Sequence, residues 1–370
     1  MINEDRLIQL FKDLCLIDAP ALREREVVNW TKQYLESNGL EVTEDDASRR
    51  LGGNANNVIA WLRGNVEGAP KIFLSAHFDT VGPTAGLVIE ERDGVFYSAS
   101  DTILGADDKG GMAPAIEAVL ALRESGRPHG DVCLLFSVAE EIGLLGASVI
   151  KPLELGLDFG YVLDTGPPVG SFVTRTATHD KLDVTIRGVP AHAGKDPEKG
   201  INAIQVAADA ISNMSLGRIS PNTTANIGVI RGGTATNVVC SEVKLFCEAR
   251  STEVGELDAQ TAHMIREFEA AADRWNTTAE IEHHRHYSAY EVAPDSQVVT
   301  RAIRAAERLG MGGELRTTLG GSDANRYNAS GCPCIVVGTG MEKIHTHDEH
   351  ISRKDLIDTT RLALELIAVE

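Results

Sequence analysis

The chain has 370 residues, 43% of them hydrophobic, so it is long enough for two globular domains and apolar enough to fill their cores. A formal net charge of −19 at pH 7 opposes binding to nucleic acid or to anionic membranes. No apolar run approaches the roughly 18 residues of a membrane helix, and we expect no secretory signal. The six cysteines lack paired zinc-type spacing, so we expect a reducing, cytoplasmic location.

The first half of the chain predicts helices that alternate with buried strands. Residues 4–39 are expected to form amphipathic helices that break near Asp18-Ala19-Pro20, and apolar residues at helical spacing predict a helix over 110–125. Continuous apolar runs predict strands at 57–62, 71–76, 132–138, 161–163 and 334–337. This alternation predicts an α/β domain with a mixed, mostly parallel sheet that helices cover on both faces.

The middle of the chain has a different pattern. Apolar and polar residues alternate over 181–187, which predicts a sheet with one face in water. The further elements expected here are a helix at 201–214, strands at 225–230 and 242–248, a helix at 256–274 and a strand at 278–284. We therefore predict an inserted α+β domain at 177–289, within a first domain made of residues 1–176 and 290–370.

Acidic and histidine residues follow the predicted buried strands. His77 and Asp79 come directly after the run 71–76, and residues two apart point the same way in extended chain. Further sites end similar runs or follow a glycine-rich loop: Asp107-Asp108, Glu140-Glu141, Asp164 and His345. Ligands of open α/β sheets bind at the carboxyl ends of the strands. So much carboxylate beside a core predicts a bound cation.

The residue types suit two metal ions. Histidine nitrogen and carboxylate oxygen bind zinc, and ions ~3.5–4 Å apart can hold the attacking and leaving oxygens of a hydrolysis. Two ions need one bridging carboxylate and about two further ligands each. The available residues are Asp107 as the bridge, His77 with Asp164 on one ion, and Glu141 with His345 on the other. The ligand set accepts two Zn²⁺, and equally Co²⁺ or Mn²⁺.

Two acidic residues remain beside these ligands. Asp79 is expected to accept a hydrogen bond from the second ring nitrogen of His77. Glu140 cannot bind metal together with Glu141 in a regular strand, because adjacent strand residues point in opposite directions. Glu140 is therefore the expected general base for a water molecule at the metals.

In order along the chain, the motifs resemble those of the di-zinc exopeptidases, and most closely their peptidase T-like branch. They are His77-Phe78-Asp79, Gly105–Gly111, Glu140-Glu141, Asp164 and His345–Glu349, which together span nearly the whole chain. The resemblance implies the ligand roles given above, catalytic roles for Asp79 and Glu140, and a cis peptide bond between Asp107 and Asp108. It also favours His345 over His347 and His350 as the ligand, because His345 has the family's spacing to Glu349.

The resemblance also implies substrate-binding residues. His192 is a loop histidine that by itself indicates a surface role. The family places it as an oxyanion donor that reaches the active site of the partner subunit in a homodimer. Asn237, Gly321 and Ser322 lie in stretches that resemble substrate-side loops of the family. Arg250 could bind a substrate carboxylate through two hydrogen bonds, or could be a surface arginine at a strand end.

We therefore predict a cytoplasmic, two-zinc exopeptidase that removes the N-terminal residue from short peptides, with the insertion as lid and dimer contact. A carboxypeptidase or an N-acyl-amino-acid deacylase remains the alternative, because the metal motifs do not separate these reactions. A non-catalytic peptide-binding protein would not need Glu140. His192-Ala193-Gly194 stands where the tripeptidases carry His-Pro-Gly, and the chain is shorter than theirs. Both differences weaken the prediction of strict tripeptide specificity.

Overall fold

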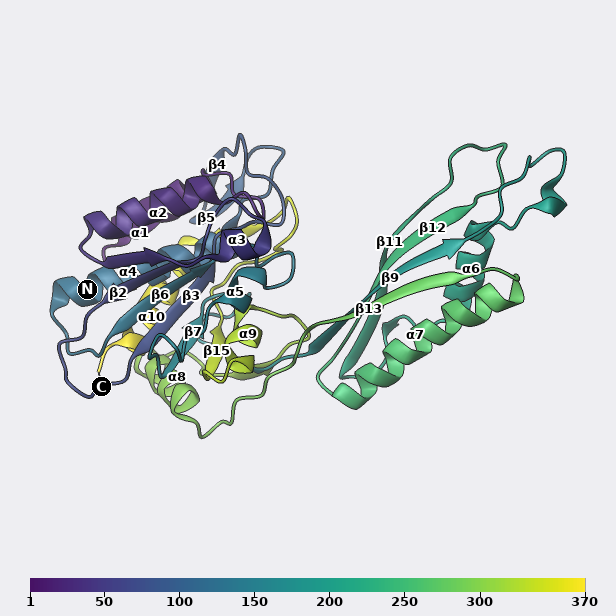
Figure 1. Cartoon of the computed structure of the whole chain (residues 1–370). Coiled ribbons are helices and arrows are strands. Elements are labelled where there is room, and N and C mark those ends of the chain that lie inside the picture. The colour runs from purple at the N-terminus through teal and green to yellow at the C-terminus, as the bar shows by residue number, and fades with distance from the viewer. Residues whose placement is uncertain (370) are drawn as a thin grey trace. The chain divides into compact units, whose positions relative to one another are not determined.

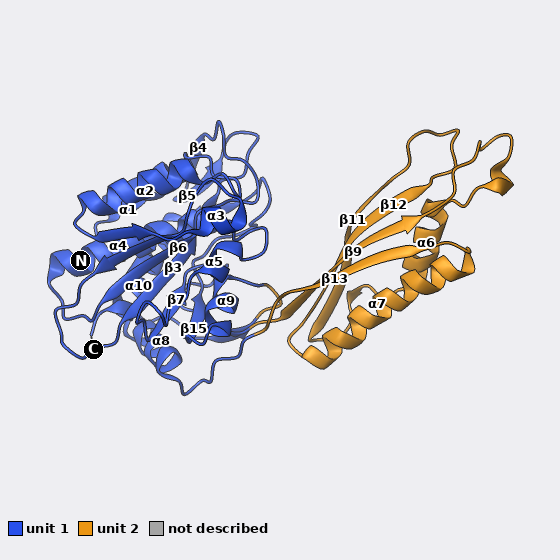
Figure 2. Cartoon of the chain, in the orientation of Figure 1, with its two compact units in different colours: residues 1–175, 290–317, 321–370 blue, residues 176–289, 318–320 orange. Residues whose placement is uncertain are grey.

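The computed structural model describes residues 1–369, which divide into two compact units (Figure 2). Unit 1 contains Met1–Arg175, Tyr290–Thr317 and the chain from Gly321 onward. Unit 2 contains Thr176–Ala289 and the short segment Thr318–Gly320. Sequence analysis assigned Thr176 and residues 318–320 to the first domain. Both belong to unit 2, where the carbonyl oxygen of Leu319 lies 3.4 Å from the guanidinium of Arg250.

Unit 1 is built on an eight-stranded sheet with both parallel and antiparallel pairs (Figure 1). The strand order is β1 (Glu41–Glu44), β2 (Val58–Leu62), β6 (Val132–Ser137), β3 (Ile72–His77), β7 (Phe159–Val162), β15 (Cys334–Val337), β8 (Phe172–Arg175) and β14 (Leu315–Thr317). Four of its seven strand pairs are parallel. The prediction of a mixed, mostly parallel α/β sheet is confirmed.

The central strands are buried because helices cover both faces. All six residues of β3 are buried, as are all six of β6. Phe73 of β3 packs edge-on against Tyr327 of α9 (Asp323–Ala329), with ring centroids 5.3 Å apart. Helices α4 (Ala106–Ser125) and α10 (Arg353–Ile367) also contact β3, and α1 (Glu4–Cys15) packs on α4. Continuous apolar strands in the sequence are the consequence of this double cover.

The remaining elements of unit 1 are short or peripheral. The helices are α2 (Arg25–Ser37), α3 (Ala47–Leu51), α5 (Leu145–Val149) and α8 (Gln297–Arg308). A separate three-stranded sheet has the order β16 (His350–Ser352), β5 (Val95–Ser98) and β4 (Ile89–Arg92). Strands of three or four residues show too few alternations for sequence periodicity to reveal them.

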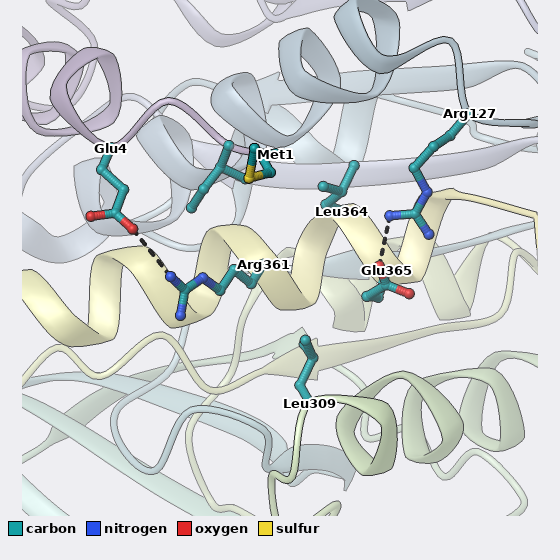
Figure 3. Close-up of a pocket in the computed structure, with 8 residues that line it drawn as sticks. Met1, Glu4, Arg127, Leu309, Arg361, Leu364 and Glu365 are labelled. Carbon is teal, nitrogen blue, oxygen red and sulfur yellow. Dashed lines mark hydrogen bonds and ion pairs between the residues drawn. The ribbon is translucent and has the colours of Figure 1, made fainter.

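The N-terminal helix is fixed to unit 1 by ion pairs. Nε of Arg6 lies 2.6 Å from Glu117 on α4, a carboxylate that is fully buried. A cavity of about 340 Å³ lies where Met1 and Leu309 approach α10 (Figure 3). The ion pairs Glu4–Arg361 and Arg127–Glu365 line it, at 3.1 Å and 2.6 Å. None of its lining residues is among the predicted site residues.

Unit 2 is an antiparallel sheet with two helices. The strand order is β10 (Gly217–Arg218), β11 (Thr223–Gly232), β12 (Glu242–Ser251), β9 (Thr178–Arg187) and β13 (Ala279–Tyr287). Helices α6 (Ala203–Asn213) and α7 (Val254–Arg274) contact β9 and β12, and a 3-10 turn covers Pro197–Lys199. On β9, Leu182, Val184 and Ile186 are buried in the core, whereas Asp183 between them is exposed. This alternation is the one that the sequence predicts.

Candidate metal centre

The candidate ligands gather at one edge of the large sheet, where parallel strands end. His77 is the last residue of β3, which is parallel to both β6 and β7. Glu141 lies four residues beyond the end of β6, and Asp164 lies two beyond the end of β7. His345 follows β15, and Asp107 lies in the first turn of α4. Residues far apart in sequence therefore meet because their strands run in the same direction.

The predicted ligands form two groups that share Asp107. One consists of His77, Asp107 and Asp164, the other of Asp107, Glu141 and His345, and in each the ligand atoms lie within 4.8 Å of one another. Oδ1 of Asp107 is 3.2 Å from Nε2 of His77, whereas its Oδ2 is 3.3 Å from Nε2 of His345. A carboxylate whose two oxygens face different histidines has the arrangement that a bridging ligand needs.

The residues of this edge fit two divalent ions. Oε1 of Glu141 and Oδ1 of Asp108 are buried and have no hydrogen-bond partner among residues 1–369. Burial raises the pKa of Asp164 well above its usual range, and the charge of Asp107 raises it further. Burial also raises the pKa of Glu140 well above normal. Carboxylates crowded in this way are stabilised by cations, and the nitrogen and oxygen donors are those that zinc and related metals bind.

The loop that carries Asp107 is held in place by Glu349. Its buried carboxylate accepts the N–H groups of Gly105 and Asp107, at 2.7 Å and 2.9 Å. Asp107 and Asp108 have non-helical backbone angles, and the peptide bond between them is cis, as the resemblance implied. At Gly111 a Cβ atom would lie 2.3 Å from Oδ1 of Asp108, so no larger residue fits there without a shift of its neighbours.

Asp79 does accept a hydrogen bond from the second ring nitrogen of His77, but through its backbone oxygen. Nδ1 of His77 lies 2.9 Å from the backbone oxygen of Asp79 and 3.5 Å from its carboxylate. The carboxylate instead accepts the N–H groups of Glu140 and Glu141, at 2.9 Å and 3.1 Å. β6 ends at Ser137, and the turn that follows places these two backbone donors at the Asp79 carboxylate. Asp79 therefore orients the Glu140-Glu141 turn directly.

Glu140 is buried beside Glu141 but belongs to neither ligand group. The strand geometry from which sequence analysis separated the two side chains is not the one observed. They do not alternate on a strand, because the chain has already left β6 and Ala139 has a positive φ of 53°.

Among the predicted substrate-binding residues, His192, Asn237 and Arg250 lie in unit 2. His192 is exposed in a loop, and Ala193 beside it donates its N–H to the backbone oxygen of Asn237 at 2.9 Å. The His192 and Asn237 loops are therefore neighbours. Arg250 on β12 lies 3.0 Å from Glu248 and 3.4 Å from the hydroxyl of Tyr287.

The other two predicted substrate-binding residues, Gly321 and Ser322, lie in unit 1 at the start of α9. Ser322 is the residue that precedes the helix, and it is buried. Its N–H donates to the side chain of Asn325 at 3.1 Å.

Sequence reasoning missed three buried charged residues near the ligands. Lys109 donates to the backbone oxygen of Phe78 and provides a positive charge among the acidic residues. Asp323 accepts a hydrogen bond from Ser137 at the end of β6, and burial raises its pKa to about 6. Glu24 accepts the N–H of Ala139 at 2.9 Å. Lys109 lies inside the Gly105–Gly111 motif, and Asp323 directly follows Ser322. No pattern in the sequence singled out Glu24.

Residues 73–369 match the family described as Peptidase family M20/M25/M40. The chain belongs to this family. Uncharacterized protein YqjE of Bacillus subtilis is 38% identical over 367 residues, 99% of each chain. The crystal structure of a tripeptidase from Staphylococcus aureus is 37% identical, has a TM-score of 0.92, and covers 99% of this chain and 98% of its own. That of the aminopeptidase PepT from Bacillus cereus is 39% identical, has a TM-score of 0.87 and has the same coverage.

These comparisons confirm the peptidase T-like resemblance and assign the chain to the M20 peptidases. Within residues 1–369, no helix combines the length and the hydropathy that crossing a bilayer would require.

Loss of one ligand should remove metal, and loss of its neighbour should not. His345→Ala should lower the metal content of the purified protein by about one ion per chain, because two carboxylates, Asp107 and Glu141, lose their shared nitrogen partner. His347→Ala is the matched control, since His347 faces Asp101 at 3.3 Å and belongs to neither ligand group. Elemental analysis after dialysis measures both. Equal metal content in the two variants would contradict the ligand assignment.

Proposed function

We propose that this M20 peptidase is a two-metal aminopeptidase that removes the N-terminal residue from short peptides, in particular tripeptides. The observation that carries the proposal is the shared position of Asp107 between two ligand groups, with Glu140 beside them and in neither. His77, Asp107 and Asp164 would hold one ion, and Asp107, Glu141 and His345 the other. Zinc is the first candidate, with cobalt and manganese as alternatives. When bound, the ions would supply Lewis acidity to the scissile carbonyl.

Glu140 is the residue that moves the proton in this proposal. Its carboxylate takes a proton from the attacking water and later delivers it to the leaving amine. Asp79 keeps it in position by holding the N–H groups of Glu140 and Glu141.

His192 would act at the oxyanion. In the proposed homodimer, His192 of one subunit donates a hydrogen bond at the active site of the other, and Asn237 in the adjacent loop contacts substrate. Unit 2 would provide the dimer contact and a lid that excludes water.

Arg250 would bind the free carboxylate of the peptide. Gly321 and Ser322 would contact the substrate at the start of α9. The acidic chain would act in the cytoplasm without nucleic acid or membrane partners.

The aminopeptidase reading is preferred over a carboxypeptidase or a deacylase because of the relatives. The two solved structures at 37% and 39% identity are described as a tripeptidase and an aminopeptidase. Ala193, which follows His192, is the departure that could relax the preference for tripeptides.

Hydrolysis of three related peptides tests the proposal. We expect zinc-loaded protein to release the first residue of a free tripeptide and to lose this activity on chelation. N-acetylation should abolish cleavage, and C-amidation should weaken it if Arg250 binds the carboxylate. Cleavage of the acetylated peptide would assign a carboxypeptidase or a deacylase instead, and no cleavage of any form would support a peptide-binding protein.

Glu140→Gln should separate proton transfer from metal binding. We expect kcat to fall by about 10²- to 10⁴-fold, because the amide cannot accept a proton from water. The metal content should stay at the wild-type level, since Glu140 is in neither ligand group. Elemental analysis and initial rates on the same preparation measure both. A rate within about twofold of wild type would remove Glu140 as the base.

Mixing two inactive variants tests the proposed role of His192. His192→Ala keeps a complete set of ligands, and Asp107→Asn keeps His192. After subunit exchange, the mixed dimer should contain one active site with intact ligands and a partner histidine, and so should recover part of the wild-type rate. If no activity returns although size measurements show mixed dimers, His192 does not act across the interface.

A further inference from the structure

Side chains hold the turn that carries Glu140 and Glu141, because they accept the backbone N–H groups of residues 138–141. Four consecutive N–H groups follow the end of β6, and each donates to a side-chain oxygen. That of Val138 donates to Asn57 at 2.9 Å. That of Ala139 donates to Oε1 of Glu24 at 2.9 Å, and the next two donate to the carboxylate of Asp79. Residues distant in sequence thus determine the path of this turn.

The turn needs such support because of its backbone conformation. Ala139 has a φ of 53°, a left-handed conformation that is unfavourable for an L-residue with a Cβ atom. Strained backbone of this kind persists only where the surroundings fix it. The carbonyl oxygens of Val138 and Ala139 are also occupied, by the N–H groups of Gly146 and Leu145 at 2.9 Å and 3.1 Å. Rotation at Ala139 would redirect the side chains of the two residues that follow.

The hydrogen bonds that the Glu24 side chain accepts come from the backbone of two segments. Glu24 is fully buried, and no arginine, lysine or histidine forms an ion pair with it among residues 1–369. Its Oε1 accepts two N–H groups, from Ala139 and from Leu22 at 2.8 Å, whereas Oε2 is buried without a partner in the described chain. Burying a carboxylate without a cation lowers stability. Its contribution must lie in what it holds.

The loop that contains Glu24 is also hydrogen-bonded to the segment that carries His77 and Asp79. The carbonyl oxygen of Ala19 accepts the N–H of Thr80 at 3.0 Å, directly after Asp79. The segment 19–24 is therefore bonded to the strand end that carries His77 and Asp79 and to the turn that carries Glu140 and Glu141.

We propose that Glu24 is a positioning residue: through the Ala139 N–H it fixes the turn that directs Glu140 and Glu141 toward the metals. This inference rests on the proposed function, because it assigns Glu140 as the base. The property required of Glu24 is an oxygen acceptor at the right distance. Negative charge is not required.

Three substitutions distinguish reach from charge. Glu24→Gln keeps an oxygen at the Oε1 position and removes the charge, so kcat should stay within about twofold of wild type. Glu24→Asp keeps the charge but shortens the side chain by one methylene, and Glu24→Ala removes the acceptor. In both, kcat on a tripeptide should fall by about 10- to 100-fold with KM little changed, because the base is displaced by a fraction of an ångström or more.

A control and a second readout separate this inference from a general loss of structure. Glu117→Gln also replaces a fully buried glutamate of unit 1, but far along α4 from Asp107, so it should leave kcat unchanged. Amide hydrogen exchange of a peptide covering residues 138–146, measured on zinc-loaded protein, reports the turn without any substrate. Exchange should accelerate in Glu24→Ala and Glu24→Asp and remain slow in Glu24→Gln.

The outcomes are distinct. An active Glu24→Asp with an inactive Glu24→Gln would show that charge matters and would overturn the proposal, as would wild-type kcat and exchange in Glu24→Ala. If the wild type cleaves no peptide, the proposed function fails and the exchange pattern alone decides the role of Glu24. If Glu24→Ala does not fold, the comparison of the Gln and Asp variants decides it.

Discussion

Repulsion among buried carboxylates is the constraint on which the architecture of this protein depends. Parallel strands converge at one edge of the sheet and bring Glu140, Glu141 and Asp164 beside Asp107 and Asp108. Lys109 supplies one buried positive charge there, and ring nitrogens of His77 and His345 lie 3.2 Å and 3.3 Å from the carboxylate oxygens of Asp107. The rest of the negative charge needs metal ions. Fold and metal binding are thus parts of one energetic problem.

Further buried carboxylates hold the backbone segments that carry the candidate ligands, by accepting hydrogen bonds from their N–H groups. Glu349 holds the N–H groups of the Asp107 loop, and Asp79 holds those of the Glu140 turn. A carboxylate that accepts backbone hydrogen bonds keeps its negative form at lower cost and also fixes the chain that it binds. The acidic residues of the edge therefore fall into two kinds, those that belong to the candidate ligand groups and those that accept backbone N–H groups.

Sequence reasoning succeeded where burial leaves a long signature. The strands that end at His77 and at Ser137 are buried at every position and largely apolar because both sheet faces are covered, and so the candidate ligands at and beyond their ends could be located. It failed where the outcome depends on one torsion angle or on a distant donor. Nothing in the sequence around Asp79 shows that its carboxylate turns to the backbone of Glu140, because that bond exists only after Ala139 adopts a positive φ. Glu24, more than 100 residues from its partner, has no local signature at all.

The short segment Thr318–Gly320 changes how the insertion is joined to its host. The backbone passes from one unit to the other four times, at residues 175–176, 289–290, 317–318 and 320–321. Unit 1 prepared by deleting residues 176–289 alone would keep Leu319, whose carbonyl oxygen would have lost its partner Arg250. Excision of either unit as an independent protein therefore requires cuts at four places, and domain exchange with a relative would have to transfer both pieces together.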